Sequence, residues 1–286
     1  MISERIDKIL DLLTEYFVKL NFNRNKEKFK KIYKKEFVYF FNDTIAKEIN
    51  IHGIYEKDEI NLISELIRSK GSIIDIGANI GNHSLAFSKI SKKVYSFEAH
   101  PRTFEVLKFN TKAYKNIKIF NLGLSNRKGL LFFDNCKSTN IGGKKLSKTG
   151  SIRSKIDKLD NIIKLDKKIK LIKIDIEGHE FEALQGMKKL LNNNNSLILL
   201  EFCEESISKR QKIINFLKEK DYLHSYYISK EKKISKKAFL DLITKILCII
   251  LFIDKKKKSK LIKVDLNSLI TNDLKSNIVF SKKKLN

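Results

Sequence analysis

The 286-residue chain has little proline, tryptophan or cysteine, and far fewer acidic than basic side chains. It contains one proline (Pro101), no tryptophan, and three scattered cysteines, Cys136, Cys203 and Cys248. Without a Cys-x-x-Cys pair, a disulfide framework or a cysteine zinc site is disfavoured, which is typical of a reducing compartment. The formal net charge of +26 attracts anionic partners such as nucleic acid, acidic glycans or lipid headgroups. A compositional bias toward lysine, isoleucine and asparagine explains the same excess without a partner.

The first 20 residues also lack the uninterrupted apolar stretch of a secretory signal peptide. Acidic side chains recur through them, namely Glu4, Asp7, Asp11 and Glu15. Their apolar residues fall on one helical face, which predicts an amphipathic helix. We therefore expect the protein to stay in the cytoplasm.

Five short apolar runs separated by helix-length segments begin at residue 72. They are 72–76, 93–97, 117–120, 171–176 and 196–201. This pattern is typical of βαβ units, in which helices cover both faces of a buried parallel sheet. We expect 222–228 and 276–281 to close the sheet as a late antiparallel hairpin. The run 129–134 adds an extra strand, and 137–151 is interpreted as a loop.

The predicted organisation is a helical or irregular extension (1–50) followed by one α/β domain (51–286). A basic and apolar insertion occupies about 230–262, and its centre, 238–253, is almost entirely apolar. As a helix this centre is about 24 Å long, shorter than a hydrocarbon core of ~30 Å. It is therefore expected either to dock peripherally on an anionic membrane or to pack against protein, including a homodimer interface.

A glycine-containing turn follows the first apolar run. Gly77, Asn79 and Gly81 lead from the strand into a helix, where free N–H groups are available to a ligand. The three-glycine spacing of a dinucleotide site is missing, and Asp75 at the strand end suits the ammonium of a methionine moiety better than a diphosphate. Glu98 ends the next strand, where Rossmann-like folds place a carboxylate that accepts both ribose hydroxyls.

The third strand leads into the segment 121–126. It is expected to form a wall against an adenine ring, with backbone contacts from Gly123, Leu124 and Ser125. Together with the glycine turn and Glu98, this order of features indicates a nucleoside cofactor.

The stretch LIKIDIEGHEFEALQG (171–186) resembles the signature turn of the FkbM family of methyltransferases. Further family-like elements occur in order, namely GIYEKDEI at 53–60, DIGANIG at 75–81, FEAHP at 97–101, NLGLS at 121–125, KLD at 158–160 and NIVFS at 277–281. The resemblance implies a seven-stranded class I fold that transfers a methyl group from S-adenosylmethionine, usually to a hydroxyl of a sugar or natural product. It implies cofactor contacts by Asp75, Gly77, Ala78, Asn79, Gly81 and Glu98, and active-site carboxylates at Asp175 and Glu177.

Methyl transfer to a hydroxyl needs alignment and removal of a proton. Asp175 stands at the carboxyl end of a strand, where ligands of open α/β sheets bind. The general base is expected among Asp175, Glu177 and His179. Alternatively, Asp175 and Glu177 hold a divalent metal that lowers the pKa of the acceptor hydroxyl. Glu201, at the end of the fifth run, is expected to line the acceptor pocket.

Two other functions stay open. The charge of +26 suits an RNA ribose 2′-O-methyltransferase in which Asp175, Glu201 and a lysine form the site. Base-directed RNA enzymes are disfavoured, because the turn after the fourth strand lacks prolines and the cysteines do not follow a proline. A catalytically silent binding protein that keeps the fold is the second alternative.

Overall fold

The structure is a computed structural model. It describes residues 54–67, 71–133, 150–163, 168–202, 206–230, 259–271 and 276–285, and also the single positions 37, 45, 49, 146 and 147. The amphipathic helix predicted within the first 20 residues and the apolar segment 238–253 lie outside the described residues. The predicted extension and insertion therefore stay predictions.

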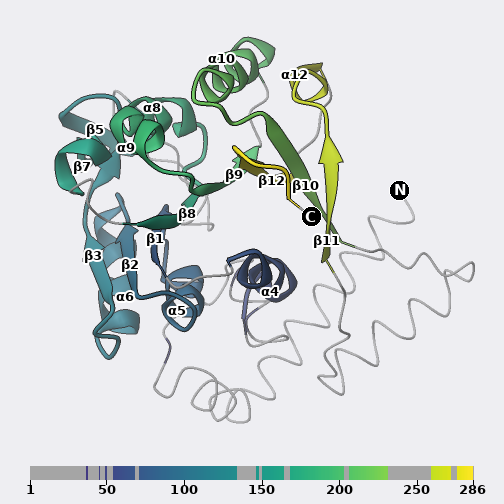
Figure 1. Cartoon of the computed structure of the whole chain (residues 1–286). Coiled ribbons are helices and arrows are strands. Elements are labelled where there is room, and N and C mark those ends of the chain that lie inside the picture. Colours follow the sequence, from purple (N-terminus) through teal and green to yellow (C-terminus); the bar gives the residue numbers. More distant parts are fainter. Residues whose placement is uncertain are drawn as a thin grey trace, which may run out of the picture. The chain divides into compact units, whose positions relative to one another are not determined.

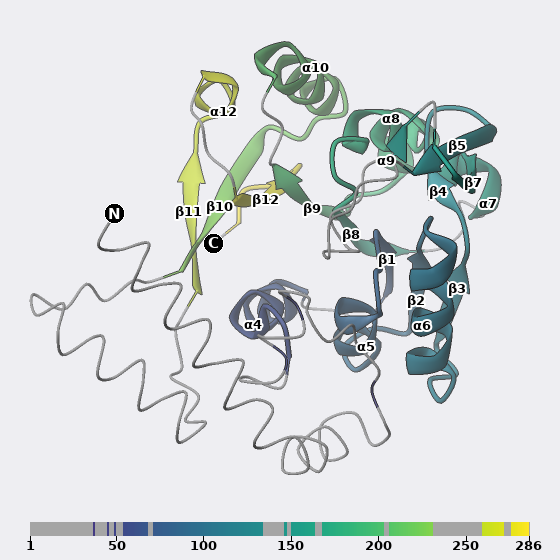
Figure 2. The same cartoon turned by 180° about the vertical axis from the view of Figure 1, so that it is seen from behind.

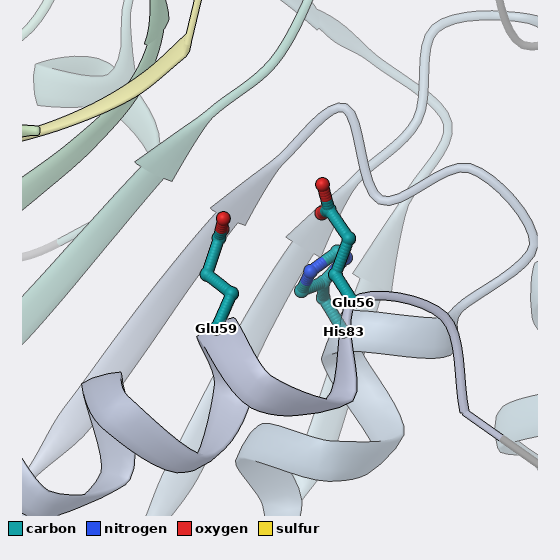
Figure 3. Close-up of side chains that lie close together, drawn as sticks. All are labelled: Glu56, Glu59 and His83. Carbon is teal, nitrogen blue, oxygen red and sulfur yellow. The ribbon is translucent and has the colours of Figure 1, made fainter. Parts of the chain in front are cut away.

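The chain divides into two compact units, one comprising residues 1–59 and 230–259 and the other residues 60–229 and 260–286. The first unit is described over a short stretch that ends in the first turn of helix α4 (Lys57–Leu66). Glu56 precedes this helix and Glu59 stands on its first turn, as Figure 3 shows. The second unit contains the residues of the candidate site described below.

The second unit is built on an eight-stranded sheet in the order β11-β10-β12-β9-β8-β1-β2-β3 (Figure 1). Its strands are β1 (Ser72–Ile76), β2 (Lys93–Phe97), β3 (Ile117–Phe120), β8 (Ile169–Ile174), β9 (Leu197–Phe202), β10 (His224–Lys230), β11 (Ser259–Val264) and β12 (Ser276–Ser281). In this sheet the neighbouring strands β9, β8, β1, β2 and β3 pair in parallel. Strand β12 runs antiparallel to both β9 and β10. The predicted class and the antiparallel pairing are confirmed, and β11 adds a strand to the predicted seven.

Successive side chains of a strand point to opposite faces, so the sheet has two hydrophobic layers. Ile73, Val94 and Leu171 pack on the side of α4 and α5 (Asn82–Ser88). Ile74 and Ile172 pack on the other side, toward α8 (Glu180–Gln185), α9 (Lys188–Asn193), α10 (Ile207–Lys218) and α12 (Ser268–Thr271). Figures 1 and 2 show these helices on the two faces, which confirms the doubly wound arrangement.

A second, four-stranded sheet has the order β4-β7-β5-β6. It consists of β4 (Gly123–Leu124), β5 (Gly129–Phe133), β6 (Leu146–Ser147) and β7 (Ile152–Asp157). The extra strand predicted at 129–134 is confirmed as β5. The loop predicted at 137–151 was wrong at residues 146–147, because these pair with β5 as β6.

Short helices complete the frame of the site. Helix α6 (Pro101–Thr111) follows β2, and α7 (Leu159–Ile162) follows β7. The Asp160 carboxylate accepts hydrogen bonds from the backbone N–H groups of Lys189 and Leu190 at 2.9 and 3.0 Å. The KLD motif therefore fixes the start of α9. Within the described residues, none of the helices combines the length and the apolar character needed to cross a membrane.

Candidate active site

The turn between β1 and α5 follows a path that few residues allow. Gly77, Asn79 and Gly81 have φ angles of 78°, 48° and 98°. A Cβ at position 77 would stand 1.8 Å from the carbonyl oxygen of Asp175. The N–H groups of Gly77 and Ala78 both donate to the Phe97 carbonyl, at 3.0 and 2.9 Å. The turn is thus held against the ends of β2 and β8, and position 77 requires glycine.

Glu98 follows β2 and is 8% exposed. Its Oε2 accepts a hydrogen bond from the backbone N–H of Asn79 at 2.9 Å, and its Oε1 accepts one from His100 at 2.8 Å. Burial raises the pKa of Glu98 to about 7, although the two backbone hydrogen bonds favour the ionised form. The carboxylate therefore ties the glycine turn to the start of α6.

A pocket opens at the carboxyl ends of the strands. Its lining comes from the segments that end β1, β2 and β8, from β4 and the residue before it, and from the end of β5. The lining residues are Ile76, Gly77, Phe97, Glu98, Ala99, Leu122, Gly123, Leu124, Phe133, Asp175, Ile176 and Glu177. Six predicted site residues are brought together here: Gly77, Glu98, Gly123, Leu124, Asp175 and Glu177. The other predicted residues are not part of this lining, namely Asp75, Ala78, Asn79, Gly81, Ser125, His179 and Glu201.

Asp75 is fully buried, at 0% exposure. Its Oδ2 accepts a hydrogen bond from Ser84 Oγ at 2.6 Å, and its Oδ1 lies 3.9 Å from Lys173 Nζ. The sequence predicts that Asp75 contacts the ammonium of the cofactor. In the structure its carboxylate lies near Lys173 instead and is not part of the pocket lining.

The turn after β8 presents two carboxylates to the pocket. Glu177 and Gly178 have φ angles of 54° and 98°. The buried Glu180 carboxylate accepts hydrogen bonds from the backbone N–H groups of Gly178 and Ile176 at 2.9 and 3.4 Å, while burial raises the pKa of Glu180. Glu180 thus holds the turn in shape, and Asp175 and Glu177 are left to face the pocket.

Asp175, Glu177 and Glu201 form a carboxylate cluster. One oxygen of each lies within 4.8 Å of the others. Burial and the charge of Asp175 raise the pKa of Glu201 well above its usual range. Burial opposes ionisation of Asp175 as well, but the Lys173 ammonium and the hydrogen bond with Glu201 outweigh it and lower the pKa of Asp175. Asp175 is therefore the ionised member of the pair and Glu201 the protonated one.

His179 lies outside this cluster. Its Nε2 is 3.0 Å from Ser125 Oγ and its Nδ1 is 3.7 Å from Glu182 Oε2. Burial lowers the pKa of His179, and this outweighs the opposing effect of the Glu182 carboxylate, while the positive charges of Lys209 and Arg127 act in the same direction as burial. A neutral His179 thus connects the turn after β8 to the segment that follows β4.

Lys173 is the site residue that the sequence interpretation missed. It lies in β8, is 3% exposed, and its Nζ is 2.9 Å from Asp175 Oδ2. A signal was present in the sequence, because a lysine inside an apolar strand and an aspartate two residues later point to the same face of the sheet.

Comparison with known proteins gives a family match. The profile of the methyltransferase FkbM domain matches residues 75–223. The chain is 32% identical over 147 residues to the hexuronic acid methyltransferase AglP of Haloferax volcanii, an alignment that covers 50% of this chain and 61% of AglP. The chain thus spans about three fifths of the length of that relative.

Among solved structures, similarity is found to a methyltransferase FkbM from Methylobacillus flagellatus KT, with 12% identity and a TM-score of 0.45, covering 90% of this chain and 59% of that chain. The precorrin-6y C5,15-methyltransferase from Geobacter metallireducens GS-15 is 11% identical, with a TM-score of 0.41 and coverage of 80% of this chain and 91% of that chain.

Proposed function

The chain belongs to the FkbM methyltransferase family, and from this premise we propose that it transfers a methyl group from S-adenosylmethionine to a sugar hydroxyl, with Asp175 as the general base. The observation that carries this proposal is that Gly77 of the glycine turn and Glu98 line the same pocket as Asp175 and Glu177. A nucleoside-binding wall and a proton acceptor at one sheet edge are what this reaction needs.

The described residues fit S-adenosylmethionine. Gly77 and Gly123 contribute only backbone to the lining, and the Glu98 carboxyl in the same lining suits the two ribose hydroxyls. The carboxylates at the carboxyl end of β8 provide the negative charge that a sulfonium favours. When bound, this cofactor supplies a methyl carbon already activated for displacement, so the protein has to align the acceptor and take its proton.

Asp175 is the best placed group to take that proton. It lines the pocket, and the Lys173 ammonium helps to lower its pKa so that it is ionised at neutral pH. Glu201, whose pKa is raised, stands beside it as a protonated partner. Glu177 is the second candidate base, since it lines the same pocket. His179 acts, in this proposal, by holding Ser125.

An acidic sugar is the acceptor class that we favour. The relative AglP is named as a hexuronic acid methyltransferase. The net charge of +26 would also draw anionic glycans toward the protein.

A divalent metal is the alternative to a purely protein-based site. Asp175, Glu177 and Glu201 offer the oxygen ligands that Mg²⁺ or Mn²⁺ prefers. However, Asp175 Oδ2 is already engaged by Lys173 Nζ at 2.9 Å, and we therefore favour catalysis without a metal. Loss of turnover in EDTA, restored by Mg²⁺ or Mn²⁺, would select the metal instead.

Contact with an anionic membrane through 230–262 and self-association stay predictions, because that segment lies almost wholly outside the described residues. Liposome sedimentation with and without phosphatidylglycerol, using a variant that lacks residues 238–260, tests the membrane contact. Equal partitioning of both proteins would remove it.

Replacing Asp175 by asparagine tests the proposed base. The amide keeps the shape of the side chain but cannot take up a proton, so single-turnover methyl transfer at saturating cofactor should fall on the order of 10²-fold or more. The control is Glu105→Gln, which removes a carboxylate that is 68% exposed on α6 and should leave turnover unchanged. Turnover near the wild-type value in Asp175→Asn would move the base to Glu177.

A further inference from the structure

The second sheet has a buried inner face, which reaches the pocket. Strands β5 and β7 pair antiparallel and lie side by side in both views (Figures 1 and 2). Along them Leu131, Phe133, Ser154 and Ile156 are at most 8% exposed. Phe133 lines the pocket, and Ser154 Oγ donates a hydrogen bond to the Ala99 carbonyl at 3.0 Å. This inner face therefore belongs to the candidate site.

The outer face of the same sheet is formed by the residues in between, because successive side chains of a strand point to opposite sides. Leu130 pairs with Lys155, and Phe132 pairs with Arg153. Leu130 is 49% exposed and Phe132 is half-buried, while both basic residues are exposed. The solvent face of an antiparallel sheet is ordinarily polar, so the apolar pair departs from the usual pattern.

Arg153 and Lys155 provide the positive charge of this face. Neither forms an ion pair with any of the residues that the structure describes. Asp157 continues the same alternation, and its Oδ1 accepts hydrogen bonds from the Lys158 N–H and from Asn161 Nδ2, both at 2.7 Å. The outer face thus combines apolar side chains with two available cations, which complements a ligand that has both C–H surfaces and negative groups.

We propose that this outer face, defined by Leu130, Phe132, Arg153 and Lys155, binds an acidic glycan chain and holds the acceptor while its reacting sugar is in the pocket. Sugar rings present C–H groups that pack on the apolar pair, and a guanidinium forms paired hydrogen bonds with a uronic acid carboxylate. Phe132 and Phe133 are consecutive but lie on opposite faces, so a single strand separates this surface from the pocket. The inference rests on the proposed function for the reaction, and it adds that the acceptor is an oligomer.

Two other occupants fit this face less well. Single-stranded nucleic acid binds to aromatic rings that stack with its bases, whereas the more exposed apolar side chain here is the leucine. A second copy of the chain would need roughly 20–30 residues on each side of a stable interface, and the outer face offers one apolar pair. The charge and the small apolar area therefore favour an acidic glycan.

Calorimetry with a galacturonic acid hexasaccharide tests the surface without any methyl transfer. The double variant Arg153→Gln with Lys155→Gln should bind this probe about tenfold more weakly than the wild type, and Leu130→Gln should weaken binding as well. A neutral galactose hexasaccharide should bind the wild type more weakly than the acidic one. The matched control is Lys92→Gln with Lys115→Gln, which removes the same charge from exposed positions before β2 and β3. Equal affinity of the wild type and the double variant, or an equal loss in the control, would overturn the proposal.

Kinetics separate the surface from the reaction. The double variant Arg153→Gln with Lys155→Gln should raise the KM for an acidic oligosaccharide about tenfold more than the KM for a single uronic acid glycoside. If the variant loses binding of the hexasaccharide while no sugar is methylated by the wild type, the surface stands and the proposed function fails. If both proteins methylate the oligosaccharide with the same KM, the proposed function stands and the surface fails. A variant that keeps the hexasaccharide but loses binding of poly-uridine, or loses self-association, would assign the face to RNA or to a second copy and overturn the proposal.

Discussion

Glu98 is the residue at which the cofactor pocket should respond to pH. Its raised pKa of about 7 means that the carboxyl is largely protonated below neutrality. Ribose hydroxyls and a cationic cofactor favour the ionised form, so binding should lower this pKa and release a proton. Cofactor affinity should therefore increase as the pH rises from about 5.5 to 7.5, by roughly tenfold for each unit by which binding lowers the pKa.

Calorimetry of S-adenosylmethionine binding across this range checks the expectation, with Glu98→Gln as the comparison. The glutamine variant should bind at least tenfold more weakly at pH 7.5, and its affinity should vary less with pH. An equal affinity of both proteins at every pH would contradict the assignment of Glu98 to the ribose.

Residue positions could be predicted where a strand end dictates them. Glu98 and Asp175 line the pocket as their places after apolar runs suggest. Lys173 was missed although Asp175, its partner at 2.9 Å, stands two residues later; its second contact, with Asp75, depends on the register between β1 and β8, which the sequence does not give. The contact between His179 and Ser125 could not be predicted from the sequence either, since it joins residues 54 positions apart.

At the scale of elements, α8 is packed tightly against the segment that follows β4. A Cβ at Gly186, just after α8, would stand 2.0 Å from the carbonyl oxygen of Ser125. Gly186→Ala should therefore displace this segment, lower the free energy of unfolding by about 1–3 kcal/mol, and weaken cofactor binding. Urea denaturation and calorimetry measure the two effects. Gly129→Ala is the control, because its new methyl group would meet no atom closer than 4.0 Å. Equal stability of the two variants would contradict the packing argument.

The elements themselves were predictable to different degrees. Residues 72–76, 93–97 and 117–120 are strands with the predicted bounds, since each is a compact apolar run. The strand predicted at 171–176 runs from Ile169 to Ile174, because the turn that begins at Asp175 is shaped by Glu180. The lysine-containing β11 was interpreted as part of an insertion, since its alternating exposure gives it no apolar run.

At the scale of the whole molecule, the order of the strands explains why distant motifs form one site. β1 lies between β2 and β8, and these strands run parallel, so the ends that carry the glycine turn, Glu98 and Asp175 meet at one edge. The alternation of apolar runs predicts a parallel sheet but not this order. The order is given by the pairing of the strands in the structure.

The most direct test of the central claim is transfer of a labelled methyl group from S-adenosylmethionine to a set of matched acceptors. The set comprises a uronic acid glycoside, the corresponding neutral hexoside, and RNA, each assayed with the wild type and with Asp175→Asn. The account predicts a methyl ether on a hydroxyl of the uronic acid glycoside, less product from the neutral sugar, and loss of both products in the variant. Label found in RNA alone, or cofactor binding with no sugar methylated, would contradict it.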